Sequence, residues 1–148
     1  MAITSCTESV YNAFLSSKIE KGFFHGHTYS ANPTSCTAAL ASIALLKSDE
    51  IQNSIKRISQ KHQEFISRIK EHPKVKHVRQ LGVILALDFH TETDRYGKLR
   101  YQLFEFYMKE GVYLRPLGNT VYILAPYIIK DEELIKIYTV IEKSFDLV

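Results

Sequence analysis

The chain has 148 residues, of which 45% are hydrophobic and 24% are charged, a balance that allows a buried core. Nineteen basic and sixteen acidic side chains give a net charge of +3, and because the two signs are interspersed we expect no nucleic-acid partner. The chain has two cysteines, no secretory signal pattern, and no apolar run near the roughly 20 residues that span a bilayer. We therefore expect a cytoplasmic protein without a membrane partner.

The first half of the chain is predicted to be mainly helical. Residues 2–7 are typical of a strand and residues 8–14 of a short helix. A second helix should begin near Asn32-Pro33, because an Asn side chain accepts from a free first-turn N–H and proline fits the first helical position. Apolar residues then recur at three- and four-residue steps until Pro73, which ends the helix, with a possible break near Ser48-Asp49.

From residue 74 the pattern changes to alternating strands and helices. It predicts two strands, a helix ended by Gly111, two further strands joined by Gly118-Asn119, and a last helix that begins at Asp131. The second strand, GVILALDF, is apolar enough to be buried on both sides. The third and fourth strands are VYLRPL and TVYILAP. This order favours an α/β fold of the α+β kind, a mostly antiparallel sheet with helices on one face.

The stretch FFHGHTYSANPTSC, residues 23–36, is rich in hydroxyl, imidazole and backbone donors. Gly26, Thr28 and Ser30 suit an anion such as phosphate, because their donors can surround an oxyanion. Two alternatives remain open. His25 and His27 could share a metal, although no carboxylate or thiol lies at ligand spacing, so no metal site is assigned; or the loop only caps the following helix.

Arg115 is a charged residue in an otherwise apolar segment. A guanidinium there is costly unless an anion satisfies it, and its planar fork matches a carboxylate. It could bind a substrate carboxylate or form an internal ion pair with Asp88 or Glu110. Tyr122 and Tyr127 nearby are typical of buried packing, although a hydroxyl could line a pocket. The sequence contains no Ser/His/Asp order, glycine-rich nucleotide loop or metal-ligand set.

Two segments resemble a known family. HGHTYSANPTSCTAALASIALL resembles the H-G-x-[ST]-x-x-x-N-P segment of class III, subgroup II, pyridoxal-phosphate aminotransferases, and GVYLRPLGNTVYILAPYII is similar to their late G-V-x-x-R-P-x-G segment. The resemblance extends over nearly the whole chain. It is greatest to the branch that makes 7,8-diaminopelargonate in biotin biosynthesis.

The resemblance implies a fold-type-I homodimer whose cofactor is pyridoxal 5′-phosphate. His27 and Thr28 would contact the cofactor phosphate across the dimer interface, Gly26 would lie against substrate, and Arg115 would bind the substrate carboxylate. The reaction implied is amino transfer from S-adenosylmethionine to 8-amino-7-oxononanoate. Residues 1–47 would be the C-terminal remnant of the large cofactor-binding domain, including the start of the interdomain helix, and residues 48–148 the C-terminal small domain.

One departure from the family concerns catalysis. The family's Schiff-base lysine stands in a K-x-[LI]-[TS]-G-G context that no lysine of this chain has, so no catalytic residue is assigned. We therefore expect Met1 to be an internal methionine of a longer protein, and the chain alone to be inactive. Two alternatives stay open: another class III aminotransferase, of the ω-amino acid or ornithine type, or a stand-alone small-molecule-binding regulatory module.

Overall fold

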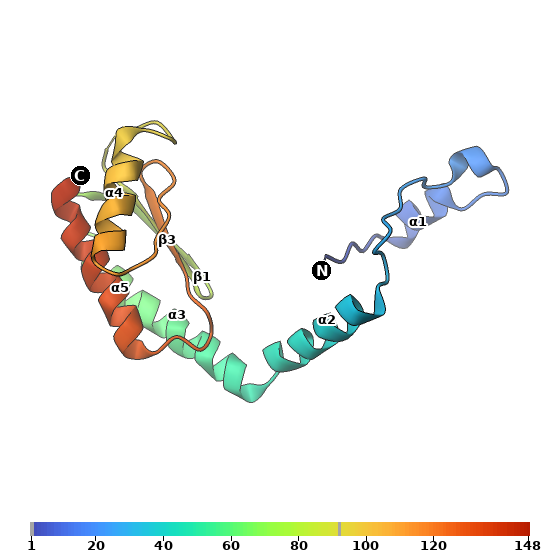
Figure 1. Ribbon diagram of the computed structural model, residues 1–148, viewed down its shortest axis with the longest axis horizontal. Helices are drawn as coiled ribbons and strands as arrows, with labels where there is room; N and C mark the ends of the chain where they lie inside the picture. The colour runs from blue at the N-terminus through green and yellow to red at the C-terminus, as the bar shows by residue number, and fades with distance from the viewer. Residues whose placement is uncertain (1, 92) are drawn as a thin grey trace. The chain divides into compact units, whose positions relative to one another are not determined.

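The computed structural model describes residues 2–91 and 93–148, and the chain divides between Lys47 and Ser48 into two compact units. The first unit contains α1 (Glu8–Phe14), the short 3₁₀ helix η1 (Ile19–Lys21) and α2 (Pro33–Leu46). The second contains the remaining helices and the sheet, as Figure 1 shows. Among the described residues no helix is long and apolar enough to cross a membrane.

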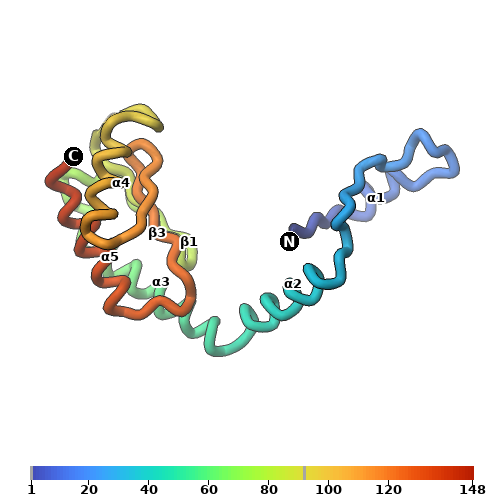
Figure 2. Tube along the Cα trace, in the orientation of Figure 1, coloured from blue at the N-terminus to red at the C-terminus, as the bar shows by residue number. Residues whose placement is uncertain are grey.

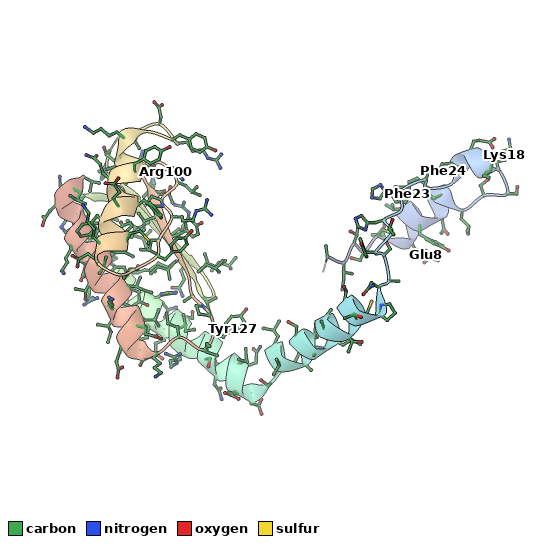
Figure 3. All side chains as sticks on the ribbon, viewed as in Figure 1. Glu8, Lys18, Phe23, Phe24, Arg100 and Tyr127 are labelled. Carbon is green, nitrogen blue, oxygen red and sulfur yellow. The ribbon has the colours of Figure 1, made fainter. Side chains whose placement is uncertain are left out.

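The first unit has no core of its own, since none of its described residues is buried. Large apolar side chains lie at its surface, among them Phe23 and Phe24, which are labelled in Figure 3 and are 66% and 77% exposed. The strand predicted for residues 2–7 is not formed. A strand requires a neighbour that pairs with its backbone, and no described residue pairs with this segment.

The second unit begins with the long helix α3 and then alternates between sheet and helix. Its elements, in chain order, are α3 (Asp49–Ile69), β1 (Val75–Leu81), β2 (Ile84–Phe89), α4 (Lys98–Lys109), β3 (Thr120–Leu124), α5 (Asp131–Lys143) and the 3₁₀ helix η2 (Ser144–Leu147). The strands form an antiparallel sheet in the order β1-β2-β3. The predicted fold class, mixed α/β with an antiparallel sheet, is confirmed.

The helix boundaries follow the local signals in the sequence. Asn32 caps α2 by accepting from the Ser35 N–H at 3.0 Å, and Pro33 occupies the first helical position. Ser48 likewise accepts from the Ile51 N–H, so the predicted break between α2 and α3 is confirmed. Gly111, with φ +71°, follows α4 in the left-handed conformation that glycine adopts most readily.

One face of the sheet is buried and the other is open. Along β2, Leu85, Leu87 and Phe89 are buried, whereas Ala86 and Asp88 between them are only half-buried. The helices cover the buried face, because the same core holds the residues that follow: Ile58, Phe65, Leu103, Tyr107, Leu134 and Ile141. The prediction that β2 is buried on both sides is therefore wrong, because no layer of the described residues covers its second face.

The strand predicted for VYLRPL, residues 112–117, is also wrong. Only Leu117 pairs with β3, through an isolated bridge to Thr120, and Pro116 has no N–H to give to a ladder. The alternation of a strand nevertheless persists: Val112, Leu114 and Pro116 are buried, and the residues between them are exposed. Figure 2 follows this segment from the end of α4 into β3.

Candidate functional site

The loop before α2 is shaped by hydrogen bonds within a tight turn. The Ser30 N–H donates to the His27 carbonyl at 2.9 Å, and the Tyr29 N–H donates to the imidazole Nδ1 of His27 at 3.2 Å. Ala31 has φ +56°, a left-handed conformation uncommon outside glycine. The turn therefore fixes His27 close to the start of α2.

A hollow of about 590 Å³ lies against this turn. Its lining includes Gly26 and His27, together with polar side chains from His25, Ser30 and Ser35. None of the described residues that line it carries a carboxylate. Hydroxyl and imidazole groups without a nearby negative charge suit an anion. Among the described residues, no cluster of three or more His, Cys, Asp or Glu side chains could hold a metal ion.

Thr28 lies in the same turn, but the structure does not place it in the lining of the hollow. Its side chain is exposed and has no hydrogen-bond partner among residues 2–91 and 93–148. Of the residues assigned to this loop, the structure thus brings Gly26 and His27 together at the hollow, and it leaves the Thr28 hydroxyl at the neighbouring surface.

Arg115 lies in the second unit, on the open side of the sheet. Arg115 is exposed, whereas its neighbours Leu114 and Pro116 are buried, so its side chain points away from the core. A groove of about 310 Å³ is lined by Arg115 and Tyr122 among mostly apolar neighbours. Arg115 therefore lies beside a groove that has a mostly apolar lining and two phenols, those of Tyr113 and Tyr122.

The two acids that could have paired with Arg115 have other partners. Asp88 accepts from the Arg79 guanidinium at 2.5 Å, and Glu110 accepts from the ammonium of Lys143 at 2.7 Å. No hydrogen bond or ion pair to Arg115 occurs within the part of the chain that the structure describes. The alternative prediction, an ion pair between Arg115 and Asp88 or Glu110, is thus wrong. The Arg115 guanidinium keeps its N–H donors available for an external anion.

The carboxylate of Asp88 is also held by a second donor, the Thr120 hydroxyl at 2.7 Å. Partial burial would raise the pKa of Asp88, but the hydrogen bonds from Arg79 and Thr120 and the nearby positive charge outweigh burial and lower it. Asp88 therefore stays ionised and paired on the open face of the sheet.

The structure separates the two tyrosines that the sequence grouped. Tyr122 is half-buried and lines the groove beside Arg115, whereas Tyr127, labelled in Figure 3, is 36% exposed and lies outside that lining. Asn119 was predicted only as a turn residue, yet its amide bonds to the carbonyl oxygens of Phe89 and Thr91. The Gly118-Asn119 pair indicated a turn in the sequence, but no sequence pattern indicated that the Asn119 amide would donate to these two carbonyl groups.

Within the described residues, the structure thus shows a donor-rich turn before a capped helix and an exposed arginine without an acid partner. The family model for class-III aminotransferases matches residues 1–145, so the chain belongs to the class-III aminotransferase family. Aminotransferases of this class use pyridoxal 5′-phosphate, and a related transaminase has been solved in its PLP-bound form.

Several individual proteins of this family are similar to the chain along nearly its whole length. The chain is 35% identical to the adenosylmethionine-8-amino-7-oxononanoate aminotransferase of Synechococcus elongatus over 99% of its own length, and 36% identical to the Geobacter sulfurreducens enzyme of that name over 100%. The crystal structure of the enzyme of this name from Methanocaldococcus jannaschii matches 96% of the chain with a TM-score of 0.81 and 26% identity. The chain spans 34% of the length of each of these relatives, about a third.

Proposed function

We propose that this chain forms the C-terminal part of a pyridoxal-phosphate aminotransferase of biotin biosynthesis. The whole enzyme would transfer an amino group from S-adenosylmethionine to 8-amino-7-oxononanoate, and it would act as a cytoplasmic homodimer. Residues 1–47 would belong to its large domain and residues 48–148 would be its small domain. The identity to the named relatives along the whole chain supports this assignment.

The observation that carries the proposal is the state of Arg115. Within the described residues its guanidinium has no acid partner, and it lies on the wall of an apolar groove beside Tyr122. A planar guanidinium can bind a carboxylate through two parallel hydrogen bonds, and the apolar lining suits an aliphatic chain. These features match an acceptor that joins a carboxylate to an aliphatic chain, as 8-amino-7-oxononanoate does.

The loop before α2 would hold the cofactor phosphate. The hollow at Gly26 and His27 is lined by donors, and no described residue in its lining carries a carboxylate, which fits a phosphate group. Thr28 is exposed in the same turn, and its hydroxyl would donate to the same phosphate. In the dimer, His27 and Thr28 would together reach a cofactor held by the partner subunit. When bound, pyridoxal phosphate would supply the carbonyl group and the electron-withdrawing ring that amino transfer requires.

This chain's own residues would bind and orient, and would not perform the proton transfers. No lysine of the chain stands in the family's K-x-[LI]-[TS]-G-G context, and the described anion-binding groups are an imidazole, hydroxyls and a guanidinium. Arg115 would hold the acceptor's carboxylate. Anchoring this end of an extended substrate would position its other, reacting end. We propose that the chain by itself does not catalyse transamination.

The experiment that tests the role of Arg115 is a binding measurement on the full chain. The probe is 8-aminooctanoate, an aliphatic carboxylate, and octylamine is its carboxylate-free counterpart. Arg115→Ala should weaken binding of 8-aminooctanoate about 10- to 100-fold, because a hydrogen-bonded charge pair contributes about 1.5–3 kcal/mol. Octylamine should bind both proteins equally.

The matched control is Arg100→Ala. Arg100 is another arginine of the second unit, labelled in Figure 3, and its guanidinium lies over the rings of Tyr96 and Tyr101, outside the lining of the groove. This variant should bind 8-aminooctanoate as the unmodified chain does. Equal binding of 8-aminooctanoate by the unmodified chain and by Arg115→Ala would contradict the proposal.

A further inference from the structure

The segment that carries Arg115 is held at its two ends and not along its length. At its start the Val112 N–H donates to the Tyr107 carbonyl at 2.9 Å. At its end Leu117 and Thr120 exchange two backbone hydrogen bonds, of 2.8 and 3.1 Å. Between these anchors no backbone hydrogen bond joins residues 113–116 to β3 within the described chain. The position of Arg115 therefore depends on how firmly the two ends are fixed.

Asn119 fixes the second end to strand β2. Its carbonyl accepts from the Phe89 N–H at 2.9 Å, and its side-chain amide donates back to the Phe89 carbonyl at 2.9 Å. In a continued ladder that carbonyl would accept from the backbone N–H of residue 119, so the side chain takes the place of a backbone donor. The same amide reaches the Thr91 carbonyl at 3.4 Å. The turn is thus joined to β2 one step beyond the Asp88–Thr120 pair.

Gly118 fixes the same turn to the loop before α4. Its N–H donates to the Arg95 carbonyl at 3.2 Å, and its φ of +64° lies in the left-handed region. A Cβ at this position would lie 3.3 Å from the Arg95 Cα, so the two backbones touch where the glycine sits. The turn therefore has contacts on two sides, and the amide of Asn119 supplies the side-chain bonds among them.

We propose that Asn119 is a positioning residue for the carboxylate-binding site at Arg115. Its amide fixes the turn, and the turn places Arg115 through the Leu117–Thr120 pair. The inference rests on the proposed function of Arg115, and Asn119 itself touches no substrate. Small displacements of a binding group weaken its interactions strongly, so loss of this anchor reduces affinity at a site several residues away.

The chain offers a matched control in Gln80. Its amide also donates to backbone carbonyls, those of Ser59 at 2.9 Å and Gly82 at 3.0 Å. These bonds lie at the Leu81–Ile84 end of the sheet, whereas Asn119 lies beyond the Asp88–Thr120 end. Gln80→Ala therefore removes bonds of the same kind from the same sheet without touching the anchor of Arg115.

The test compares Asn119→Ala, Asn119→Asp, Gln80→Ala and Arg115→Ala in the full chain. Asn119→Asp keeps the shape of the side chain but removes its donors, so it separates hydrogen bonding from packing. Two quantities are measured: the affinity for 8-aminooctanoate, and the NMR backbone order parameters of residues 113–117. Both Asn119 variants should lower these order parameters and weaken binding about tenfold, whereas Gln80→Ala should leave both quantities unchanged.

The two measurements separate failure of this inference from failure of the proposed function. If Arg115→Ala binds 8-aminooctanoate as the unmodified chain does, the proposed role of Arg115 fails and the order parameters alone decide whether Asn119 fixes the segment. If binding depends on Arg115 but the Asn119 variants match Gln80→Ala in either quantity, the positioning role is overturned. Asn119→Asp decides the result where Asn119→Ala fails to fold.

Discussion

His62 is a fully buried imidazole in the second unit, and both of its ring nitrogens have partners. Nε2 lies 3.0 Å from the Val83 carbonyl and Nδ1 lies 2.7 Å from the Tyr138 hydroxyl. Because a carbonyl can only accept, Nε2 carries the ring hydrogen and Nδ1 accepts from Tyr138. Burial lowers the pKa of His62 below its ordinary value of 6.5 and outweighs the opposing effect of the Val83 bond. The folded chain therefore keeps this ring neutral.

The neutral state of His62 predicts a loss of stability in mild acid. The unfolded chain takes up a proton near pH 6.5, whereas the folded chain takes it up only at a lower pH, so this contribution is complete above pH 6.5. Below that pH the free energy of unfolding should fall, by at most about 1.4 kcal/mol per pH unit, until the folded pKa is reached. Urea titrations at a series of pH values measure this slope. His62→Gln should flatten it, and an equally steep slope in that variant would contradict the assignment.

Arg115 shows which features of a candidate site a sequence can reveal. Its charge within an apolar segment was visible in the sequence, and so were the two acids that could have paired with it. The partners of those acids were not visible, because the Arg79–Asp88 pair depends on strand register and the Lys143–Glu110 pair joins residues 33 positions apart. Whether an arginine remains available to a ligand is thus a property of the folded chain.

At the scale of whole elements, Arg57 joins α3 to the start of α5. Its guanidinium pairs with Asp131 and also donates to the Ile129 carbonyl at 2.5 Å. Arg57→Ala should lower the free energy of unfolding by about 1 kcal/mol, because it removes both bonds from a partly exposed site. Asp131→Asn should cost less, since the bond to the Ile129 carbonyl remains. Urea denaturation of the two variants measures the difference.

A surface pair within α3 provides the control for this prediction. The Lys61 ammonium lies 3.3 Å from a carboxylate oxygen of Glu64, and it makes no bond to another element among the residues that the structure describes. Lys61→Ala should change the free energy of unfolding by less than about 0.5 kcal/mol. If Arg57→Ala were no more destabilising than Lys61→Ala, the link between α3 and α5 would be of no energetic consequence.

Helices and strands differed in how well the sequence predicted them. The starts of α2 and α3 depend on Asn32 and Ser48, whose side chains act within three residues, and both were predicted correctly. The strand predicted at residues 112–117 failed because pairing requires a ladder with β3, and the segment with Pro116 pairs only at Leu117. The prediction that both faces of β2 are buried failed for a similar reason, since burial of the second face requires a second layer of helices or strands against the sheet. Local signals were sufficient for helix ends but not for pairing or layering.

At the scale of the whole molecule, the two units differ in what stabilises them. The second has a hydrophobic core beneath its sheet, whereas no described residue of the first is buried. Limited trypsin digestion should therefore cut the first unit before the second, at Lys18, Lys21 or Lys47, because a segment without a core opens at little cost. Mass spectrometry of the early fragments identifies the sites. A first cut after residue 74 would contradict this difference between the units.

An activity measurement on a chimera tests whether this chain supplies the carboxylate-binding part of an aminotransferase. The chain replaces the matching third of the Synechococcus elongatus relative, to which it is 35% identical, and the chimera is assayed with 8-amino-7-oxononanoate and S-adenosylmethionine. We predict amino transfer, and a rise of about tenfold or more in the KM for 8-amino-7-oxononanoate on Arg115→Ala. A folded, active chimera whose acceptor KM is unchanged by Arg115→Ala would contradict the claim.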